Sequence, residues 1–223
     1  MLDNTMKWLV VIWTLTVLCV APPTSAAQSN TPTEAVVRAA LAPLDKIEID
    51  RLKVMGPAIL PHLGHIYATS SEDDRAVIAW VFYSLGWKSP AAKAALLKDI
   101  HTQNQKLRLQ VQWALGRVSD DDDVVDILAG IMRNDGNALF RDKAACALAY
   151  DQIHLSEKQK VKLYSRLIDG LSDQKPQVRT ISIQALSIHT CQTKGFDPNG
   201  PAEDRANATA RWMTWLAEYE KNL

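Results

Sequence analysis

The stretch DDRAVIAWVFY (Asp73–Tyr83) is the first of four copies of one pattern. Each copy has an arginine near its start and a large apolar residue seven positions later. The other copies are KLRLQVQWALG (Lys106–Gly116), LFRDKAACALA (Leu139–Ala149) and QVRTISIQALS (Gln177–Ser187). The repeated arginines are Arg75, Arg108, Arg141 and Arg179, which are 33, 33 and 38 residues apart. The chain therefore contains an internal repeat.

Each repeat is predicted to be a pair of helices, with the arginine pattern on the second helix. Before the third copy, for example, Val124, Ile127, Leu128 and Ile131 recur at the spacing of one helix face. Helix pairs that recur at this period are typical of an α-solenoid, in which neighbouring units bury one another's apolar faces. We therefore expect an all-α fold, an α-solenoid of about four helical hairpins over residues 56–190.

The flanks of the repeat array are predicted to differ from it. Residues 28–55 read as a linker followed by an irregular pair of helices, Glu34–Leu41 and Asp45–Val54. Residues 191–223 read as a turn-rich bridge and a tryptophan-bearing helix, Ala202–Tyr219, which would cap the last hairpin. The helices expected within the array are Pro57–Ala68, Asp73–Leu85, Pro90–His101, Lys106–Val118, Val124–Arg133, Ala138–Tyr150, Glu157–Leu171 and Gln177–Thr190.

The N-terminus is predicted to be a signal peptide, residues 1–27. Lys7 precedes the apolar run Trp8–Val20, and small residues follow it up to Ala27. We expect cleavage after Ala26 or Ala27 and export to the periplasm or the medium. If the segment is retained instead, it would be the chain's contact with the membrane. Export makes a disulfide chemically possible, but the repeat register separates Cys146 and Cys191 too far for a bridge.

The overall charge argues against two classes of partner. The chain has 25 basic and 25 acidic residues, so its formal net charge is zero. Proteins that bind nucleic acid or anionic lipid through a general attraction carry a positive excess. We expect no nucleic-acid partner.

The repeat resembles HEAT repeats in the short bacterial form shared with phycobilisome-lyase-type HEAT-like proteins. The best match is DQKPQVR (Asp173–Arg179) followed by Ala185 and Leu186, and the segment GFDPNGP (Gly195–Pro201) resembles the ending of exported HEAT-like proteins. The resemblance implies a structural task for the repeated arginines, which would reach neighbouring loops. The aspartates available to them are Asp73, Asp142 and Asp173. The alternative is a ladder of positive charge for an acidic ligand.

No catalytic residue, cofactor or metal is predicted. The nucleophile, zinc-protease, Cys-x-x-Cys and phosphate-loop motifs that mark common enzyme classes do not occur. His62 and His65 could share one helix face, but no third ligand follows at a telling spacing. The run Asp120–Asp123 lacks the glycine and closing glutamate of a calcium loop, so we interpret it as a helix cap.

The inner face of the second helices is the predicted binding surface. Positions one, five and eight after each repeated arginine share a face. In the first two copies this face includes Trp80, Tyr83, Leu109 and Trp113, which are candidate partner-binding residues. The alternative is that both tryptophans pack between repeats.

These features predict a non-catalytic, exported scaffold that binds a protein or peptide on its concave face. Two alternatives stay open. One is an enzyme or lyase-like activity, by analogy with the lyase-associated repeats, and the other is a structural component of the envelope.

Overall fold

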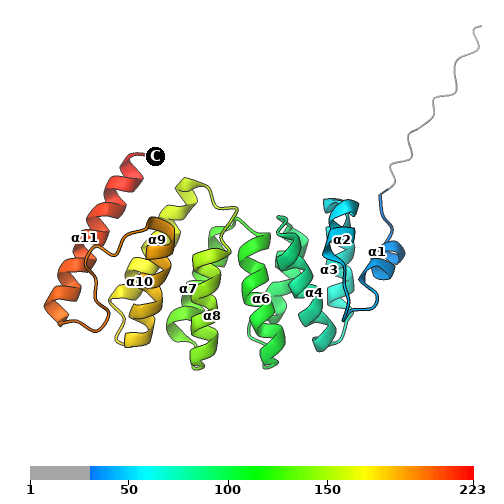
Figure 1. Ribbon diagram of the computed structural model, residues 1–223, viewed down its shortest axis with the longest axis horizontal. Coiled ribbons are helices and arrows are strands. Elements are labelled where there is room, and N and C mark those ends of the chain that lie inside the picture. The colour runs from blue at the N-terminus through cyan, green and yellow to red at the C-terminus, as the bar shows by residue number, and fades with distance from the viewer. Residues whose placement is uncertain (1–30) are drawn as a thin grey trace, which may run out of the picture. The chain divides into compact units, whose positions relative to one another are not determined.

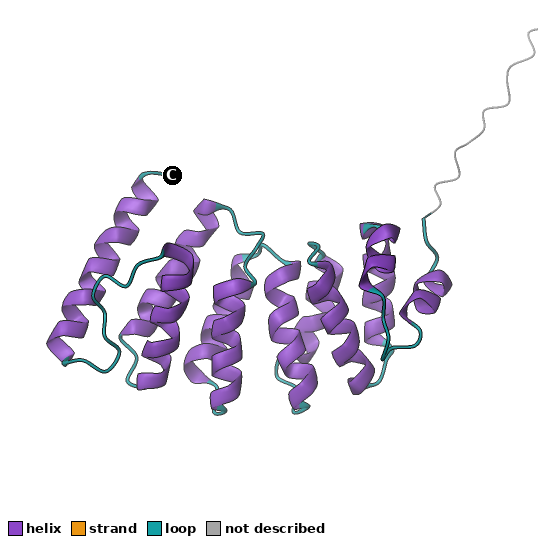
Figure 2. Ribbon diagram, viewed as in Figure 1, coloured by secondary structure: helices purple, strands orange, loops and turns teal. Residues whose placement is uncertain are grey.

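Every regular element in the computed structural model, which describes residues 31–223, is a helix (Figures 1 and 2). Successive helices stack in hairpins, so the predicted all-α solenoid is confirmed. The predicted signal peptide lies outside the described residues. None of the helices in residues 31–223 combines the length and apolar character needed to cross a bilayer.

Eleven α-helices and two 3-10 helices make up the described part of the chain. The N-terminal ones are α1 (Glu34–Leu41), α2 (Ile49–Met55), η1 (Pro57–Ile59), α3 (Leu60–Ala68), α4 (Glu72–Leu85), α5 (Pro90–Leu96) and η2 (Leu97–Asp99). The others are α6 (Gln105–Val118), α7 (Asp122–Asn134), α8 (Ala138–Tyr150), α9 (Glu157–Leu171), α10 (Pro176–Thr190) and α11 (Ala202–Lys221).

The helices form two layers. The second layer consists of α2, α4, α6, α8 and α10, and each of these helices contacts the next one in the layer. The first layer holds α1, α3, α5, α7, α9 and α11, each paired with its hairpin partner except the last (Figure 1). One continuous apolar core runs between the layers from Val37 to Trp212. This arrangement follows from the sequence pattern, because a single hairpin cannot bury its own apolar face.

Local signals set most of the helix ends. The side chains of Ser71, Ser89, Asn104 and Ser156 accept hydrogen bonds from the first turns of α4, α5, α6 and α9. Such a cap stabilises a helix by about 1 kcal/mol. At the other end of α4, Gly86 adopts the left-handed conformation that terminates the helix.

The predicted helix Asp45–Val54 was wrong at its start, because α2 begins at Ile49. Residues 43–46 form a turn instead, in which the amide of Lys46 donates to the carbonyl of Pro43 over 3.0 Å. The resulting short pair of α1 and α2 still packs on α3 and α4 as one more hairpin of the stack.

The repeated arginines tie each hairpin to the following segment. Arg75 pairs with Asp99, Arg108 with Asp135, Arg141 with Gln177, and Arg179 with the backbone carbonyl of Pro198. Each also donates to backbone carbonyls in the turn before its own helix. The suggested partners Asp73 and Asp142 do not take this role, and Asp173 takes it only through its backbone carbonyl. The repeat spacing identified these arginines, but it could not predict the loop geometry that selects their partners.

The C-terminal helix α11 packs on α9 through aromatic side chains. Trp212 is fully buried, and its indole N–H donates to the carbonyl of Thr193 over 3.2 Å. Trp215 and Tyr219 both lie against Tyr164 of α9, with ring centroids 5.3 Å apart in each case. The last first-layer helix is therefore held to the stack by its rings, while the bridge of residues 191–201 connects it to α10.

Candidate functional site

The second-layer face is the side of α4, α6, α8 and α10 that points away from the first layer. Its members are Trp80, Tyr83, Leu109, Trp113, Cys146, Tyr150, Gln184 and Ile188. None of these eight side chains falls in the fully buried class, although each lies on a helix whose opposite side is buried in the core. The repeat register therefore brings them to one continuous surface.

The four predicted binding residues divide into two groups. Trp80 is exposed, with 38 % of its surface accessible. Tyr83, Leu109 and Trp113 are half-buried and pack against the core. The rings of Tyr83 and Trp113 lie 6.3 Å apart at their centroids and bridge α4 to α6. The structure thus places all four on the second-layer face, where Trp80 is partly exposed and Trp113 packs between α4 and α6.

Sequence reasoning missed two exposed apolar residues on the same face. Tyr150 is 60 % exposed and Ile188 is 40 % exposed. Both stand nine positions after their repeat arginine, one helical turn beyond position five. The signal was present in the repeat, at a position outside the predicted set of one, five and eight.

A groove of about 450 Å³ lies at the surface between α8 and α10 on this face. Its floor includes the small side chains of Ala145, Cys146 and Ala149, and Tyr150 and Ile188 stand among its walls. Burial raises the pKa of the Cys146 thiol, so this side chain is neutral near pH 7. The groove is thus mostly apolar, and its volume lies within the range of ligand-binding pockets in proteins.

A loop after α8 crosses α6 and forms the edge of the face. Asp151 is buried and accepts a hydrogen bond from Nε of Arg117 over 2.9 Å, and the same guanidinium lies 4.2 Å from the ring centre of Tyr83. Further along, Nε2 of His154 lies 2.8 Å from the carbonyl oxygen of Gly86 at the end of α4. Burial raises the pKa of Asp151, while Arg117 opposes that shift. The loop therefore joins three successive hairpins.

Gly116 allows this crossing. A Cβ atom at position 116 would lie 2.8 Å from Cβ of Asp151 and 2.8 Å from the amide nitrogen of Gln152. Both distances are too short for unbonded heavy atoms, so only glycine lets the loop approach α6 this closely.

The two polar clusters singled out in the sequence have ordinary partners. His65 contacts Glu34 of α1 over 2.8 Å. In the aspartate run, Asp120 pairs with Lys88, while Asp121 and Asp123 pair with Lys93. These lysines hold the pKa values of Asp120 and Asp121 below their usual range. The N-cap residue of α7, Asp121, makes no side-chain capping bond, so its carboxylate serves the ion pair instead.

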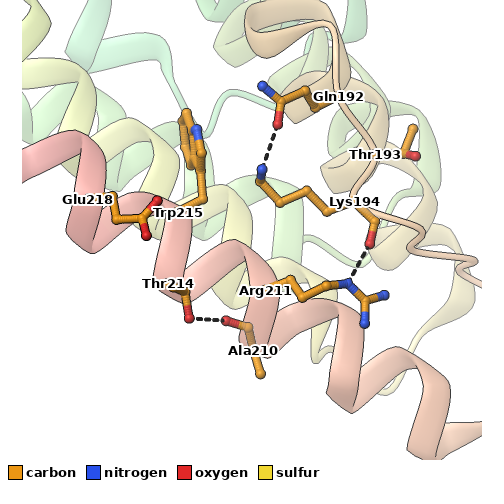
Figure 3. Close-up of a pocket in the computed structure, with 8 residues that line it drawn as sticks. All are labelled: Gln192, Thr193, Lys194, Ala210, Arg211, Thr214, Trp215 and Glu218. Carbon is orange, nitrogen blue, oxygen red and sulfur yellow. Dashed lines mark hydrogen bonds between the residues drawn. The ribbon is translucent and has the colours of Figure 1, made fainter.

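A second hollow, of about 710 Å³, lies between α11 and the bridge (Figure 3). The ammonium of Lys194 lies over the rings of Trp212 and Trp215 and donates to Gln192. Arg211 donates through Nε to the carbonyl of Lys194, and its guanidinium points away from the Lys194 ammonium (Figure 3). The two cations therefore do not converge on one point, and the side chains that line the hollow come from α11 and from the bridge that follows α10.

The sequence matches no protein-family model and no curated protein. Among residues 31–223, no three His, Cys, Asp or Glu side chains group closely enough to hold a metal ion.

Proposed function

We propose that the protein is a non-catalytic, exported scaffold of HEAT-like repeats that binds a protein or peptide across its second-layer face. The observation that carries the proposal is the position of three of the eight exposed large apolar side chains in residues 31–223. Trp80, Tyr150 and Ile188 belong to three different helices of one layer, and all three are exposed on the same face. This face is the one that the resemblance to HEAT repeats implies to be concave.

The size and type of these residues support binding. Large aromatic residues are usually buried, and Trp and Tyr are enriched among residues that dominate the affinity of interfaces. Exposed apolar side chains gathered on one face indicate an interaction surface, whereas single scattered ones do not. The groove between α8 and α10 adds a place where a partner side chain can insert.

The scaffold supports the same proposal. The repeat arginines and the crossing loop connect adjacent hairpins, so the face is held in one shape before binding. A surface that needs no ordering loses less entropy when a partner binds. The arginines themselves are engaged with carboxylates, amide oxygens and backbone carbonyls, which disfavours the alternative of a positive ladder for an acidic ligand.

Capture of a partner by immobilised full-length protein tests the proposal. The extract should come from the envelope of cells that produce the protein. The test variant is Trp80→Ser/Tyr150→Ser, and the control is Val36→Ser/Met213→Ser, which removes exposed apolar residues from the first layer. Both variants should keep the helical circular dichroism of the parent.

A partner retained by the parent and the control, but lost by the test variant, is the expected result. Equal retention by both variants would contradict the proposal, as would the absence of any partner specific to the folded protein.

A further inference from the structure

Asp142 is the one charged residue among those that line the groove between α8 and α10. The other lining residues are alanines, neutral polar side chains, Tyr150 and two isoleucines. The Cys146 thiol adds no charge near pH 7, because burial raises its pKa. The groove therefore joins an apolar floor to a single carboxylate.

The carboxylate of Asp142 has room for a second cation beside its ion pair with Lys143. Its Oδ2 atom lies 3.0 Å from Nζ of Lys143, the next residue in the chain, and its side chain is 42 % exposed. A carboxylate offers about four acceptor positions, so a second cation can bind it without displacing the lysine. Lys143 itself is not among the lining residues of the groove.

The floor and walls fit an apolar chain that ends in a positive charge. Ala145, Ala149 and Ala185 are buried and small, so they leave the depth of the groove open. Long basic side chains lay their aliphatic stems along apolar surface and keep their charged ends at its edge. An apolar neighbour of such a residue would meet Tyr150 and Ile188.

The geometry points to a peptide segment in which a large apolar residue stands next to arginine or lysine as the occupant of this groove. The basic side chain meets Asp142, and the apolar one fills the space between α8 and α10. This inference rests on the proposed function and specifies the chemistry of the partner. An acidic segment would bring like charges together and is disfavoured.

Fluorescence polarisation with three labelled peptides tests the inference on the full-length protein. The peptides share one Gly/Ser frame and differ in a central pair, which is Leu-Arg, Leu-Gln or Leu-Glu. Affinity should fall in that order. Asp142→Asn should weaken binding of the Leu-Arg peptide about threefold, as is usual for a partly exposed ion pair, and should leave the Leu-Gln peptide unchanged.

Asp169→Asn is the matched control, because Asp169 is 41 % exposed and pairs with Arg166 on the first-layer helix α9. It should leave all three affinities unchanged. Gln184→Trp, which fills the groove from its exposed wall, should abolish binding, whereas Ala94→Trp on the exposed side of α5 should not. Both tryptophan variants can be checked for folding by circular dichroism.

Equal affinity for the Leu-Arg and Leu-Glu peptides, equal effects of Asp142→Asn and Asp169→Asn, or no binding by any peptide would overturn the inference. If the capture experiment succeeds while these peptides fail, the proposed function stands and the groove chemistry is wrong. If capture fails as well, both are wrong.

Discussion

The two halves of the second-layer face share one repeat register and differ in the size of the residues it carries. At position five after the repeat arginine, α4 and α6 have Trp80 and Trp113, whereas α8 and α10 have Cys146 and Gln184. In the first half, the ring of Trp113 lies against Tyr83 and bridges the helices. In the second half, small side chains leave a groove. Side-chain volume at a few repeat positions therefore decides whether neighbouring helices present a filled surface or a groove.

The largest expected effect concerns position five in the two halves. Trp113→Ala should lower the free energy of unfolding by about 3 kcal/mol, because loss of the half-buried ring would leave a cavity between α4 and α6. Cys146→Ala removes a single sulfur atom from the floor of an existing groove and should cost about 1 kcal/mol or less. Urea unfolding of both variants measures the difference. Equal losses would mean that the two halves are packed alike.

A second prediction concerns the ion pair between Arg117 and Asp151, which lies beside Tyr83 at the edge of the second-layer face. Arg117→Gln should destabilise the protein by about 2 kcal/mol at pH 7, because it leaves the buried Asp151 carboxylate without its cation. Loss of Arg117 also raises the pKa of Asp151 further above that of the unfolded chain. The native state then takes up a proton more readily than the unfolded state, so the loss of stability should shrink as the pH falls towards 5.

Urea unfolding of this variant and the parent at pH 7 and pH 5 checks that sign. A loss that grows on acidification would show that Asp151 is not the group left unpaired. Lys143→Gln, which removes a partly exposed cation from α8, serves as the control and should show no comparable pH dependence.

The third prediction uses the two free thiols of the described residues as reporters. Cys146 lies half-buried in the groove with a raised pKa, whereas Cys191 is exposed beyond α10. Iodoacetamide should therefore modify Cys191 severalfold faster than Cys146. Gln184→Trp should slow Cys146 further and leave Cys191 unchanged. Similar rates at the two sites would indicate that the reagent and solvent reach Cys146 as freely as Cys191, which would contradict its burial in the groove.

The smallest effect is expected for Trp80. Trp80→Ser should lower the free energy of unfolding by about 1 kcal/mol, less than Trp113→Ala, because 38 % of Trp80 is exposed. Thermal unfolding followed by circular dichroism measures this. A loss as large as that of Trp113→Ala would assign Trp80 to the core and remove it from the binding face.

The repeat pattern predicted much of the fold because each helix carries its own signals. The bounds of α8 and α9 agree with those expected from periodicity, the turn before Ala138 and the capping serine Ser156. The predicted start of α2 was wrong because the turn that precedes the helix depends on local hydrogen bonding after Pro43. Helix ends without strong capping residues are the least predictable part of such a chain.

The candidate site was only partly predictable. Trp80 and Trp113 stood out because they recur in register, and Tyr150 and Ile188 could have been found by extending the same register by one turn. The crossing loop could not have been found, since it depends on Gly116, Arg117 and Asp151 meeting across 34 residues of sequence. No short-range pattern encodes that contact.

Site-specific photo-cross-linking in the cells that produce the protein tests the binding face most directly. A benzophenone amino acid would replace Gln184 in the groove or, as the control, Ala94 on the exposed side of α5. A discrete cross-linked partner is expected from position 184 and none from position 94. Cross-links of equal yield from both positions, or from position 94 alone, would contradict the assignment of the second-layer face as the binding surface.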